Sequence, residues 1–585
     1  MNQKIADPIL WQWNDPLPDG GFRHTVFSRG EIDSQVLPRR QGEEGEIGAV
    51  NVLAAQIDDD KRLVAARFQI IAPESGHFVE GTLVHLLAVN RARWLFATLV
   101  AAAVEKPLAF GEANSILADV RKTKIICTLG PASKSSETLR QLIHAGADVF
   151  RLNMSHAEHS WVREIVPRIR KIAAEVQRPV AILLDTQGPA IRTGQLKTNL
   201  ELKPDDILEF TVRGAKSEEE YSVDVNYDGL IKDISAGDTV LVDNGVIRLL
   251  VLEKPKNRIR CKVLTHGTLG SRRHINLPGI RVNLPPLTQK DLEDVALGAE
   301  LGVDFVALSV ARQRSDLEEL RSVVKKLGST AQIIAKIEDQ SAVRQIDDMI
   351  DAADAVMIAR GDLGIECPME ELPIIQRRIV KRCLRMGKPV IVATHMLESM
   401  IENPVPTRAE ITDVANAVFE QADAIMLSGE TTTGRYPVEC VKVFDRVARR
   451  IERSGGAGFG ADALLEDNRQ KTVASAVVLA NSLSHAKLVV FTRHGTRARH
   501  VSNMRPEKAP IFAFTLSEQV CRQLTLCWGT YPILMDFADD PNRTIESAVK
   551  YLRDEKLTEP NDNLVILSDI RAGEALVDCV QLRTV

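Results

Sequence analysis

The sequence is poor in cysteine and shows no large excess of charge of either sign. Its 585 residues include only eight cysteines, and none of them stands in a CxxC pair or at a spacing typical of zinc ligands. Several lie inside apolar runs, which predicts reduced, mostly buried thiols in a cytoplasmic protein. The net charge is −5, from 74 basic and 79 acidic residues, and no long basic stripe is present. We therefore expect no nucleic acid partner.

Long apolar runs are also missing. The most apolar stretch, residues 95–104, is too short to span a bilayer and is flanked by Arg91, Arg93 and Glu105. Residues 1–21 lack the basic start and the apolar core of a signal peptide. These absences predict a soluble protein without a membrane partner.

The length points to several domains, since a single core rarely supports 585 residues. Residues 1–46 are polar and rich in glycine, proline and acidic side chains, and we expect much of this stretch to be irregular. Residues 47–72 predict two strands joined by a DDDK turn, and residues 79–104 predict an apolar helix. We interpret residues 1–120 as an α+β extension of unknown role.

Eight short apolar runs between residues 124 and 428 are the main sign of the fold. Near-continuous apolar runs suit parallel strands that are buried on both faces, and helix-like stretches separate most of them. The pattern predicts an α/β protein built on a (β/α)8 TIM barrel. The runs are KIICT (124–128), ADVFRLN (147–153), PVAILLD (179–185), DFVALS (304–309), QIIAKIE (332–338), DAVMIA (354–359), PVIVAT (389–394) and DAIMLS (423–428).

The barrel pattern is interrupted once and is followed by a further domain. Barrel-like alternation covers residues 121–190 and 284–453, whereas residues 191–283 show short strands and turns. We interpret this interruption as an inserted small β-barrel domain that can act as a lid. A linker is expected at 454–470, and residues 471–585 alternate helices with strands, which predicts a C-terminal α/β domain.

Polar residues stand at the ends of the predicted strands, where a barrel of this kind builds its active site. Lys336 and Glu338 are two apart on an extended run and therefore point to the same side. Polar residues also simply mark where buried strands meet solvent, which is the alternative explanation for a part of the set. The residues at or just beyond the strand ends include Arg151, Asn153, Ser155, Asp185, Thr186, Lys336, Glu338, Asp362, Thr394 and Ser428.

Several segments, taken together, resemble the pyruvate kinase family. They occur in the order found in that family, and the resemblance extends over residues 121–585. The segments are KTKIICTLGPAS (122–133), FRLNMSH (150–156), LDTQGPAIRTG (184–194), NLPG (276–279), AKIE (335–338), ARGDLGIE (359–366), ATHMLESM (393–400), PTRAEITDVANAV (406–418) and LSGETTTGRYP (427–437).

The resemblance implies transfer of the phosphoryl group of phosphoenolpyruvate to ADP, which yields pyruvate and ATP in glycolysis. Such a transfer depends on positioning and charge stabilisation more than on covalent chemistry. Glu338 and Asp362 match the family's ligands of Mg²⁺, or of Mn²⁺ in its place. Lys336 matches the ammonium group that stabilises the phosphoryl group and the enolate. Arg151 matches a guanidinium group that holds phosphate.

Further residues match the family's substrate site. The turn formed by Ala359, Arg360, Gly361 and Asp362 resembles a helix start whose N–H groups receive the substrate carboxylate. Thr394 matches a hydroxyl near the carbon that is protonated, and we assign it to a proton relay through water. A capping role for Thr394 is the alternative.

The resemblance also implies a K⁺ site and contacts to the nucleotide. Ala190 stands where K⁺-dependent members commonly have glutamate and K⁺-independent members have lysine, so this neutral residue leaves the K⁺ requirement open. The matching K⁺ ligands are Asn153, Ser155, Asp185 and the backbone of Thr186. The matching nucleotide contacts are Asn153, Arg192 and Arg273.

A turn in the C-terminal domain matches the position of the family's effector loop. Hydroxyl groups, a flexible glycine and a helix start can together hold a phosphate. The resemblance therefore implies a sugar phosphate or nucleotide effector and a homotetramer, and an ordinary strand-to-helix turn is the alternative. The residues of this turn are Thr492, Gly495, Thr496 and Arg497.

Two other functions remain open at this level. A barrel lyase acting on phosphoenolpyruvate or pyruvate also uses Mg²⁺ and carboxylates, but it needs neither the lid nor the nucleotide arginines. The second alternative is a scaffold protein, namely a kinase that has lost its activity. Residues 1–120 would then serve as its interaction module. The presence of Lys336, Glu338, Asp362, Arg151 and Thr394 together argues against the scaffold.

Overall fold

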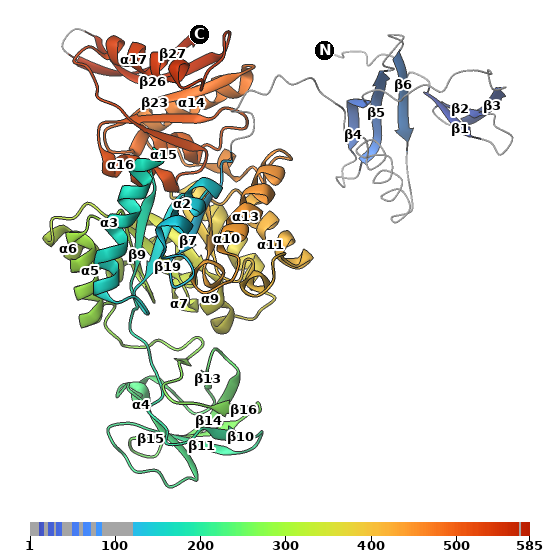
Figure 1. Cartoon of the computed structure of the whole chain (residues 1–585). Helices are drawn as coiled ribbons and strands as arrows, with labels where there is room; N and C mark the ends of the chain where they lie inside the picture. The colour runs from blue at the N-terminus through green and yellow to red at the C-terminus, as the bar shows by residue number, and fades with distance from the viewer. Residues whose placement is uncertain are drawn as a thin grey trace. The chain divides into compact units, whose positions relative to one another are not determined.

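The computed structural model describes residues 121–572 and 575–585, together with six strands between residues 11 and 84. The chain divides into two compact units, residues 1–113 and 114–585, and each is described by itself. The second unit contains a closed barrel, an inserted β domain and a C-terminal α/β domain (Figure 1).

The N-terminal unit contains two antiparallel sheets of three strands each. The two strands expected within residues 47–72 are confirmed, but two other expectations for this region are wrong. Residues 1–46, expected to be largely irregular, contain three strands, and residues 78–84 form a strand instead of the start of a helix. The segment FVEGTLV (78–84) contains β-branched residues, which favour extended backbone, and it pairs with the preceding strand. The rest of the expected helix, residues 85–104, lies outside the described residues. The strands are β1 Trp11–Pro16, β2 Phe22–Ser28, β3 Glu31–Leu37, β4 Val50–Ile57, β5 Leu63–Ile71 and β6 Phe78–Val84.

The eight apolar runs form a closed parallel barrel, as the sequence predicts. Neighbouring strands follow the order β18, β19, β20, β21, β22, β7, β8 and β9 around the ring. The interior cluster mixes large side chains such as Phe305 with alanines such as Ala307 and Ala355, so the barrel is a packed core and not a channel. The strands are β7 Lys124–Thr128, β8 Val149–Asn153, β9 Ala181–Asp185, β18 Phe305–Leu308, β19 Gln332–Ile337, β20 Ala355–Ala359, β21 Val390–Ala393 and β22 Ala424–Leu427.

Helices cover the outside of the barrel and bury their apolar faces against the strands. The helices that begin at Gln289 and Arg408 start with reciprocal capping boxes, Thr288 with Asp291 and Thr407 with Glu410, which satisfy N–H groups at the first turn. The helices are α2 Ser136–Ala145, α3 His159–Glu175, α5 Gln289–Glu300, α6 Arg314–Lys326, α7 Gln340–Arg344, α8 Ile346–Ala352, α9 Arg360–Glu366, α10 Leu372–Arg385, η1 Glu398–Ile401, α11 Arg408–Phe419, α12 Gly429–Thr432 and α13 Pro437–Glu452.

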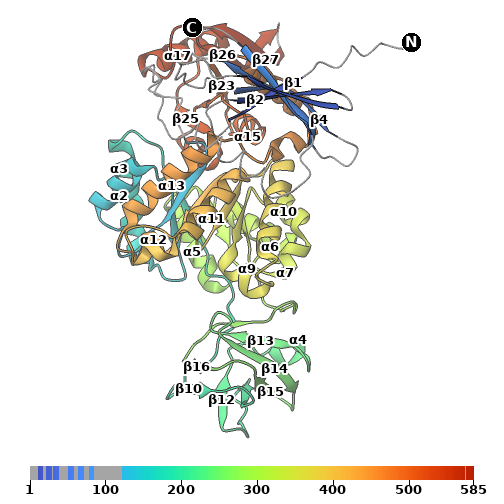
Figure 2. The same cartoon turned by 90° about the vertical axis from the view of Figure 1, so that its right-hand side faces the viewer.

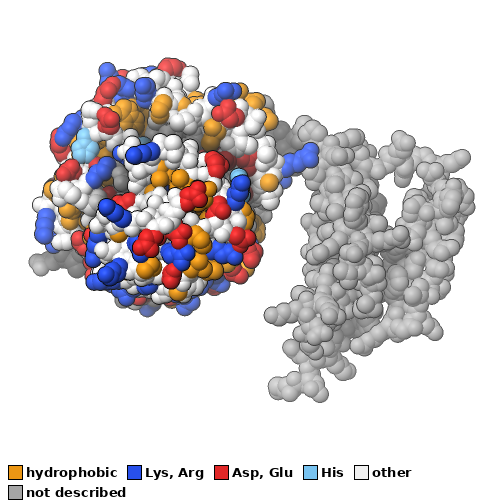
Figure 3. Space-filling view, turned by 90° about the horizontal axis from the view of Figure 1, so that it is seen from below, with side chains coloured by type: hydrophobic (Ala, Val, Ile, Leu, Met, Phe, Trp, Pro, Cys, Tyr) orange, Lys and Arg blue, Asp and Glu red, His pale blue; other side chains and the backbone are white. Residues whose placement is uncertain are grey.

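The inserted domain is all-β apart from one short helix and leaves the barrel after β9 (Figures 1 and 2). Its strands form a six-stranded sheet and a two-stranded sheet around a core of their own. Basic, acidic and hydrophobic side chains are interspersed on the face drawn in Figure 3, without a continuous area of one charge. The elements are β10 Leu200–Leu202, β11 Ile207–Thr211, β12 Tyr221–Asp224, α4 Leu230–Asp233, β13 Thr239–Val242, β14 Ile247–Glu253, β15 Arg258–Val263, β16 Gly267–Leu269 and β17 Ile275–Asn276.

The C-terminal domain is a five-stranded sheet in the order β25, β24, β23, β26 and β27, in which only β27 is antiparallel. Among the described residues, no helix is long and apolar enough to cross a membrane. The elements are η2 Phe459–Asp462, α14 Asn468–Ser482, β23 Ala486–Phe491, α15 Thr496–Asn503, β24 Ile511–Thr515, α16 Glu518–Gln523, η3 Leu524–Leu526, β25 Thr530–Leu534, α17 Pro541–Asp554, β26 Asn563–Ala572 and β27 Ala575–Thr584.

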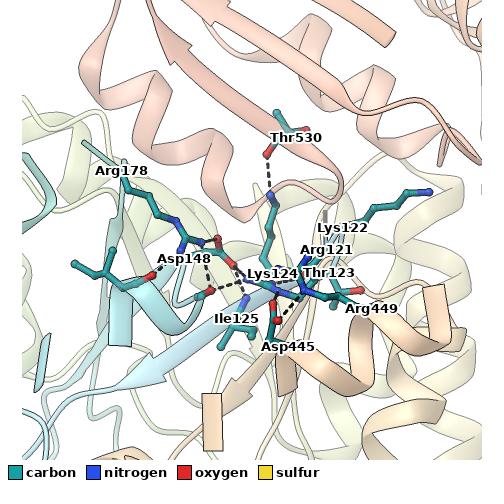
Figure 4. Close-up of polar contacts among 12 residues, drawn as sticks. Arg121, Lys122, Thr123, Lys124, Ile125, Asp148, Arg178, Asp445, Arg449 and Thr530 are labelled. Carbon is teal, nitrogen blue, oxygen red and sulfur yellow. Dashed lines mark hydrogen bonds and ion pairs between the residues drawn. The ribbon is translucent and has the colours of Figure 1, made fainter. Parts of the chain in front are cut away.

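The C-terminal domain packs on the N-terminal ends of the barrel strands, opposite the end where the inserted domain leaves. Leu526 joins the interior cluster of the barrel from η3. Lys124, the first residue of β7, donates a hydrogen bond from Nζ to the carbonyl of Thr530 at 2.7 Å, as Figure 4 shows. The buried carboxyl of Asp148 lies near Lys124. Burial opposes ionisation of this carboxyl, but Arg121 and Arg178 outweigh burial and lower the pKa of Asp148 to about 2.

Lys124 is expected to make the stability of the protein depend on alkaline pH. Burial lowers the pKa of Lys124 from 10.5 to about 8, so between these values the unfolded chain binds more protons than the folded one. The free energy of unfolding therefore rises with pH across this window, by about 3 kcal/mol for a shift of this size. Lys124→Met should lack this rise, as measured by chemical denaturation between pH 7 and pH 10.5.

Other groups that titrate at alkaline pH contribute to both proteins, so the difference between the wild type and Lys124→Met isolates Lys124. The exposed Lys134 provides the control, since Lys134→Met should follow the wild type at every pH. Parallel pH profiles for the wild type and Lys124→Met would contradict the prediction.

Candidate active site

A buried lysine stands at the centre of the polar groups at the C-terminal ends of the barrel strands. Lys336 lies on β19 and is 8% exposed. Its Nζ lies 2.7 Å from Glu338 Oε1, 2.7 Å from Ser309 Oγ and 3.3 Å from Asp185 Oδ1. An ammonium group has three N–H donors, so these three contacts occupy all of them. The side chain is therefore held in one orientation.

The charges of this cluster stabilise one another in a place where water is largely excluded. Burial alone would lower the pKa of Lys336, but Asp185 and Glu338 outweigh it and raise the pKa above its usual value. Burial likewise opposes ionisation of Asp185, yet Lys336 and Arg151 lower the pKa of that carboxyl. Burial raises the pKa of Glu338, and the nearby Asp362 adds to the effect while Lys336 opposes it. Lys336 thus carries a fixed positive charge.

Arg151 brings a second positive charge to the same carboxylate. Its Nε donates to Asp185 Oδ2 at 2.6 Å and its Nη1 to Thr128 Oγ1 at 3.0 Å. The β8–β9 register places Asn153 directly beside Asp185. Ser155 follows, with its N–H donating to Asn153 Oδ1 at 3.2 Å. The structure therefore places Asn153, Ser155 and Asp185, three of the residues predicted for K⁺, at the ends of two neighbouring strands.

Glu338 and Asp362 line one cavity of about 110 Å³ between the barrel and the base of the inserted domain. Glu338 Oε2 accepts a hydrogen bond from the N–H of Val310 at 2.6 Å, which fixes the carboxylate. Among the described residues, no group of three or more His, Cys, Asp or Glu side chains gathers as a metal site. Two carboxylates on an open cavity fit Mg²⁺, which takes few protein ligands and completes its shell with substrate oxygens and water.

The short helix α9 follows β20 and places its first N–H groups beside Thr394. The N–H of Gly361 donates to Thr394 Oγ1 at 2.7 Å, and that hydroxyl donates to the carbonyl of Ala393 at 2.7 Å. The guanidinium group of Arg360 turns away from the cavity and forms two hydrogen bonds to Asp413, of 2.6 and 2.7 Å. Arg360 also donates to the carbonyl of Thr394 at 2.8 Å, so it anchors this turn.

Comparisons with known proteins identify the family. The family model described as "Pyruvate kinase, barrel domain" matches residues 120–441, and "Pyruvate kinase, alpha/beta domain" matches residues 470–580. The chain belongs to the pyruvate kinase family. It is 39% identical to "Pyruvate kinase 2" of Synechocystis sp. over 461 residues, 78% of each chain. It is 41% identical to "Pyruvate kinase" of Geobacillus stearothermophilus over 465 residues, again 78% of each chain.

A plant relative shows a similar level of identity. "Plastidial pyruvate kinase 3, chloroplastic" of Arabidopsis thaliana is 40% identical over 451 residues, 76% of this chain and 78% of the relative. The chain is therefore a phosphotransferase of the pyruvate kinase family, which confirms the resemblance noted in the sequence. This result favours the kinase over the lyase alternative.

In this pyruvate kinase fold the two predicted nucleotide arginines lie on the inserted domain. Arg192 is exposed and donates from Nη1 to the carbonyl of Arg272 at 3.2 Å. Arg273 pairs with Asp243 at 3.3 Å. The backbones of Thr193 and Arg273 are hydrogen bonded at 2.8 Å, so both arginines stand on adjacent segments. In the described part of the chain, neither arginine forms a hydrogen bond or ion pair with Lys336.

The predicted effector turn lies at the start of α15, but the guanidinium group of Arg497 already has partners within the domain, among them the carbonyl of Phe491 at 2.9 Å. Arg497 is 8% exposed, and its guanidinium pairs with Asp569 and Asp578. Arg499 lies closer to the turn, with Nη2 3.4 Å from Thr496 Oγ1. Thr492 is buried, and Gly495 has a φ of 80°, which favours glycine.

Sequence reasoning missed three residues that hold the site together. Thr128 and Ser309 contact Arg151 and Lys336, respectively, and each is the last residue of one of the eight apolar runs, a signal that could have found them. Asn276 of the inserted domain donates to Glu366 Oε1 at 3.1 Å and thereby links that domain to α9. This last contact joins residues 90 positions apart, and no local pattern predicts it.

Proposed function

We propose that the protein transfers the phosphoryl group of phosphoenolpyruvate to ADP, giving pyruvate and ATP in glycolysis. The observation that carries the proposal is the buried ammonium group of Lys336, held 2.7 Å from Glu338 beside the cavity that Asp362 also lines. A fixed positive charge next to a divalent-cation site suits a reaction in which negative charge moves between two oxygen atoms.

In this reaction the bond between phosphorus and the enol oxygen breaks, and a bond forms to a β-phosphate oxygen of ADP. Arg151 and Lys336 hold the transferred phosphoryl group, and Lys336 stabilises the enolate that is left behind. Arg192, Arg273 and Asn153 bind the phosphates of the nucleotide. The exposure of Arg192 and the placement of Arg273 beside it support this assignment.

Glu338 and Asp362 bind Mg²⁺ or Mn²⁺, and Asn153, Ser155, Asp185 and the carbonyl of Thr186 bind K⁺. When bound, the divalent cation neutralises phosphate charge and orients the oxygen atoms for in-line transfer. The K⁺ ligands are oxygen donors on adjoining strand ends, which supports the second site. Ala190 is neutral and so does not indicate whether K⁺ is required, which needs a separate measurement.

The substrate carboxylate is received by the N–H groups of residues 359–362 at the start of α9, where the helix favours negative charge. Thr394 passes a proton from water to the methylene carbon of the enolate, which completes pyruvate. The hydrogen bond from Gly361 to Thr394 supports this arrangement, since it holds the hydroxyl beside the carboxylate site.

Three further features belong to the proposal. A sugar phosphate or nucleotide effector binds at the turn of Thr492, Gly495, Thr496 and Arg497, which Arg499 also approaches. The enzyme works as a homotetramer. Its location is the cytoplasm, where the free thiols of its eight cysteines, seven of them buried, remain reduced.

The test is a coupled assay of pyruvate formation by the full-length protein, with each component omitted in turn. We expect pyruvate to appear only with phosphoenolpyruvate, ADP and Mg²⁺ together, in equal amounts with ATP. Exchange of K⁺ for Na⁺ or a large organic cation then determines the monovalent requirement. Pyruvate formation without ADP, or none under any condition, would refute the proposal.

A further inference from the structure

The hydroxyl group of Ser309 lies at a junction between Lys336 and the end of β9. Ser309 follows β18 and is 4% exposed. Its Oγ lies 2.7 Å from Lys336 Nζ, 2.6 Å from the carbonyl oxygen of Thr186 and 3.2 Å from Asp185 Oδ1. Its N–H donates to Thr186 Oγ1 at 3.1 Å, so the residue is fixed by both backbone and side chain.

The direction of these hydrogen bonds follows from the chemistry of the groups. An ammonium group only donates, so Ser309 Oγ must accept from Lys336. The single hydroxyl proton then points to the Thr186 carbonyl, which is the shorter of the two remaining contacts. Ser309 therefore has no freedom to rotate away from Lys336 without losing a buried hydrogen bond.

The neutrality of Ser309 matters for the charge that Lys336 presents. The other two acceptors of Lys336 are carboxylates, and each of them offsets part of the positive charge. A hydroxyl fixes the direction of the ammonium group without adding a third negative charge. A phosphoryl group that approaches Lys336 can then replace a long contact, such as the 3.3 Å contact with Asp185, while the contact with Ser309 remains.

We propose that Ser309 is a positioning residue, which holds the ammonium group of Lys336 in the orientation required for phosphoryl transfer. This inference rests on the role of Lys336 in the proposed function. It predicts that loss of the Ser309 hydroxyl lowers kcat and not substrate affinity. The site keeps all of its charges, but the ammonium group of Lys336 is no longer aligned with the transferred phosphoryl group.

A packing role is the competing explanation. The backbone of Gly188 passes close to Ser309, and a Cβ built on Gly188 would come within 3.0 Å of Ser309 Cβ. Substitutions that change the size of residue 309 therefore disturb this contact. Cysteine is nearly the same size as serine but is a weak hydrogen-bond acceptor, so it separates packing from hydrogen bonding.

The test measures steady-state kinetics of full-length Ser309→Ala, Ser309→Cys, Lys336→Met and the double variant Ser309→Ala with Lys336→Met. We expect Ser309→Ala and Ser309→Cys to lower kcat about 10- to 100-fold, with KM values within about threefold of the wild type. In the Lys336→Met background, Ser309→Ala should have no further effect, because the group that it positions is already gone. Thermal unfolding shows which variants are folded.

Ser428 provides a matched control. It also follows a barrel strand, and its buried hydroxyl lacks a hydrogen-bond partner, so Ser428→Ala should retain wild-type kinetics. Additive losses in the double variant, or full activity of Ser309→Cys, would overturn the positioning role. Wild-type protein that forms no pyruvate from phosphoenolpyruvate and ADP would overturn the proposed function itself. Loss of activity in Lys336→Met, together with unchanged kinetics of both Ser309 variants, would overturn only the role of Ser309.

Discussion

Replacing Lys336 by methionine is expected to lower kcat for pyruvate formation about 10³-fold, the loss typical of removing a preorganised electrostatic group from a closed site. Methionine has a similar length but no charge. The enolate and the transferred phosphoryl group then lose the cation that Asp185 and Glu338 hold in place. KM for phosphoenolpyruvate should change much less, because Arg151 and the N–H groups of α9 remain.

The same substitution at an exposed lysine of the same barrel is the control. Lys325 lies in the last turn of α6, and Lys325→Met should leave kcat unchanged. Lys336→Met also removes a partner from two buried carboxylates, so thermal unfolding must accompany the assay. Wild-type turnover by folded Lys336→Met protein would show that the ammonium group is not needed.

Replacing Glu338 by glutamine is expected to lower kcat about 100-fold and to raise the half-saturating Mg²⁺ concentration at least tenfold. Glutamine keeps the shape of the side chain and can still accept from the N–H of Val310, but it lacks the charge of a cation ligand. It also removes the closest charged partner of Lys336. The rate is measured across a titration of free Mg²⁺.

A titration that gives the wild-type Mg²⁺ dependence would remove Glu338 from the metal site. Glu319→Gln serves as the control, because Glu319 is exposed on α6 and should affect neither the rate nor the Mg²⁺ dependence. Addition of Mn²⁺ to Glu338→Gln provides a second measurement, since a cation that binds more tightly should recover a part of the lost rate.

Much of the barrel could be predicted because burial on both faces leaves a direct trace in the sequence. A strand such as β9, Ala181–Asp185, is apolar until its last residue, where the chain meets the polar end of the barrel. The secondary structure of the N-terminal unit was harder to predict from the sequence. The segment FVEGTLV precedes the short apolar stretch of residues 95–104, and its strand character depends on pairing with β5, which the local pattern does not reveal.

The candidate site was predictable in its residues but not in its contacts. The spacing of Lys336 and Glu338 already indicates that both point to one side. Arg360 and Arg497 show the limit of such reasoning, since both stand in expected motifs yet direct their guanidinium groups to Asp413 and Asp578. These partners lie on other elements, far along the chain.

The sequence by itself determined the strands of the barrel, its family and the residue types at the ends of its strands, because periodic burial and local motifs are properties of neighbouring residues. Only the tertiary structure decided that Ser309, Asp185 and Glu338 surround one ammonium group and that Lys124 reaches the C-terminal domain. Closure of the barrel and domain packing bring together side chains that are far apart in the chain, and the energy of each contact depends on that burial.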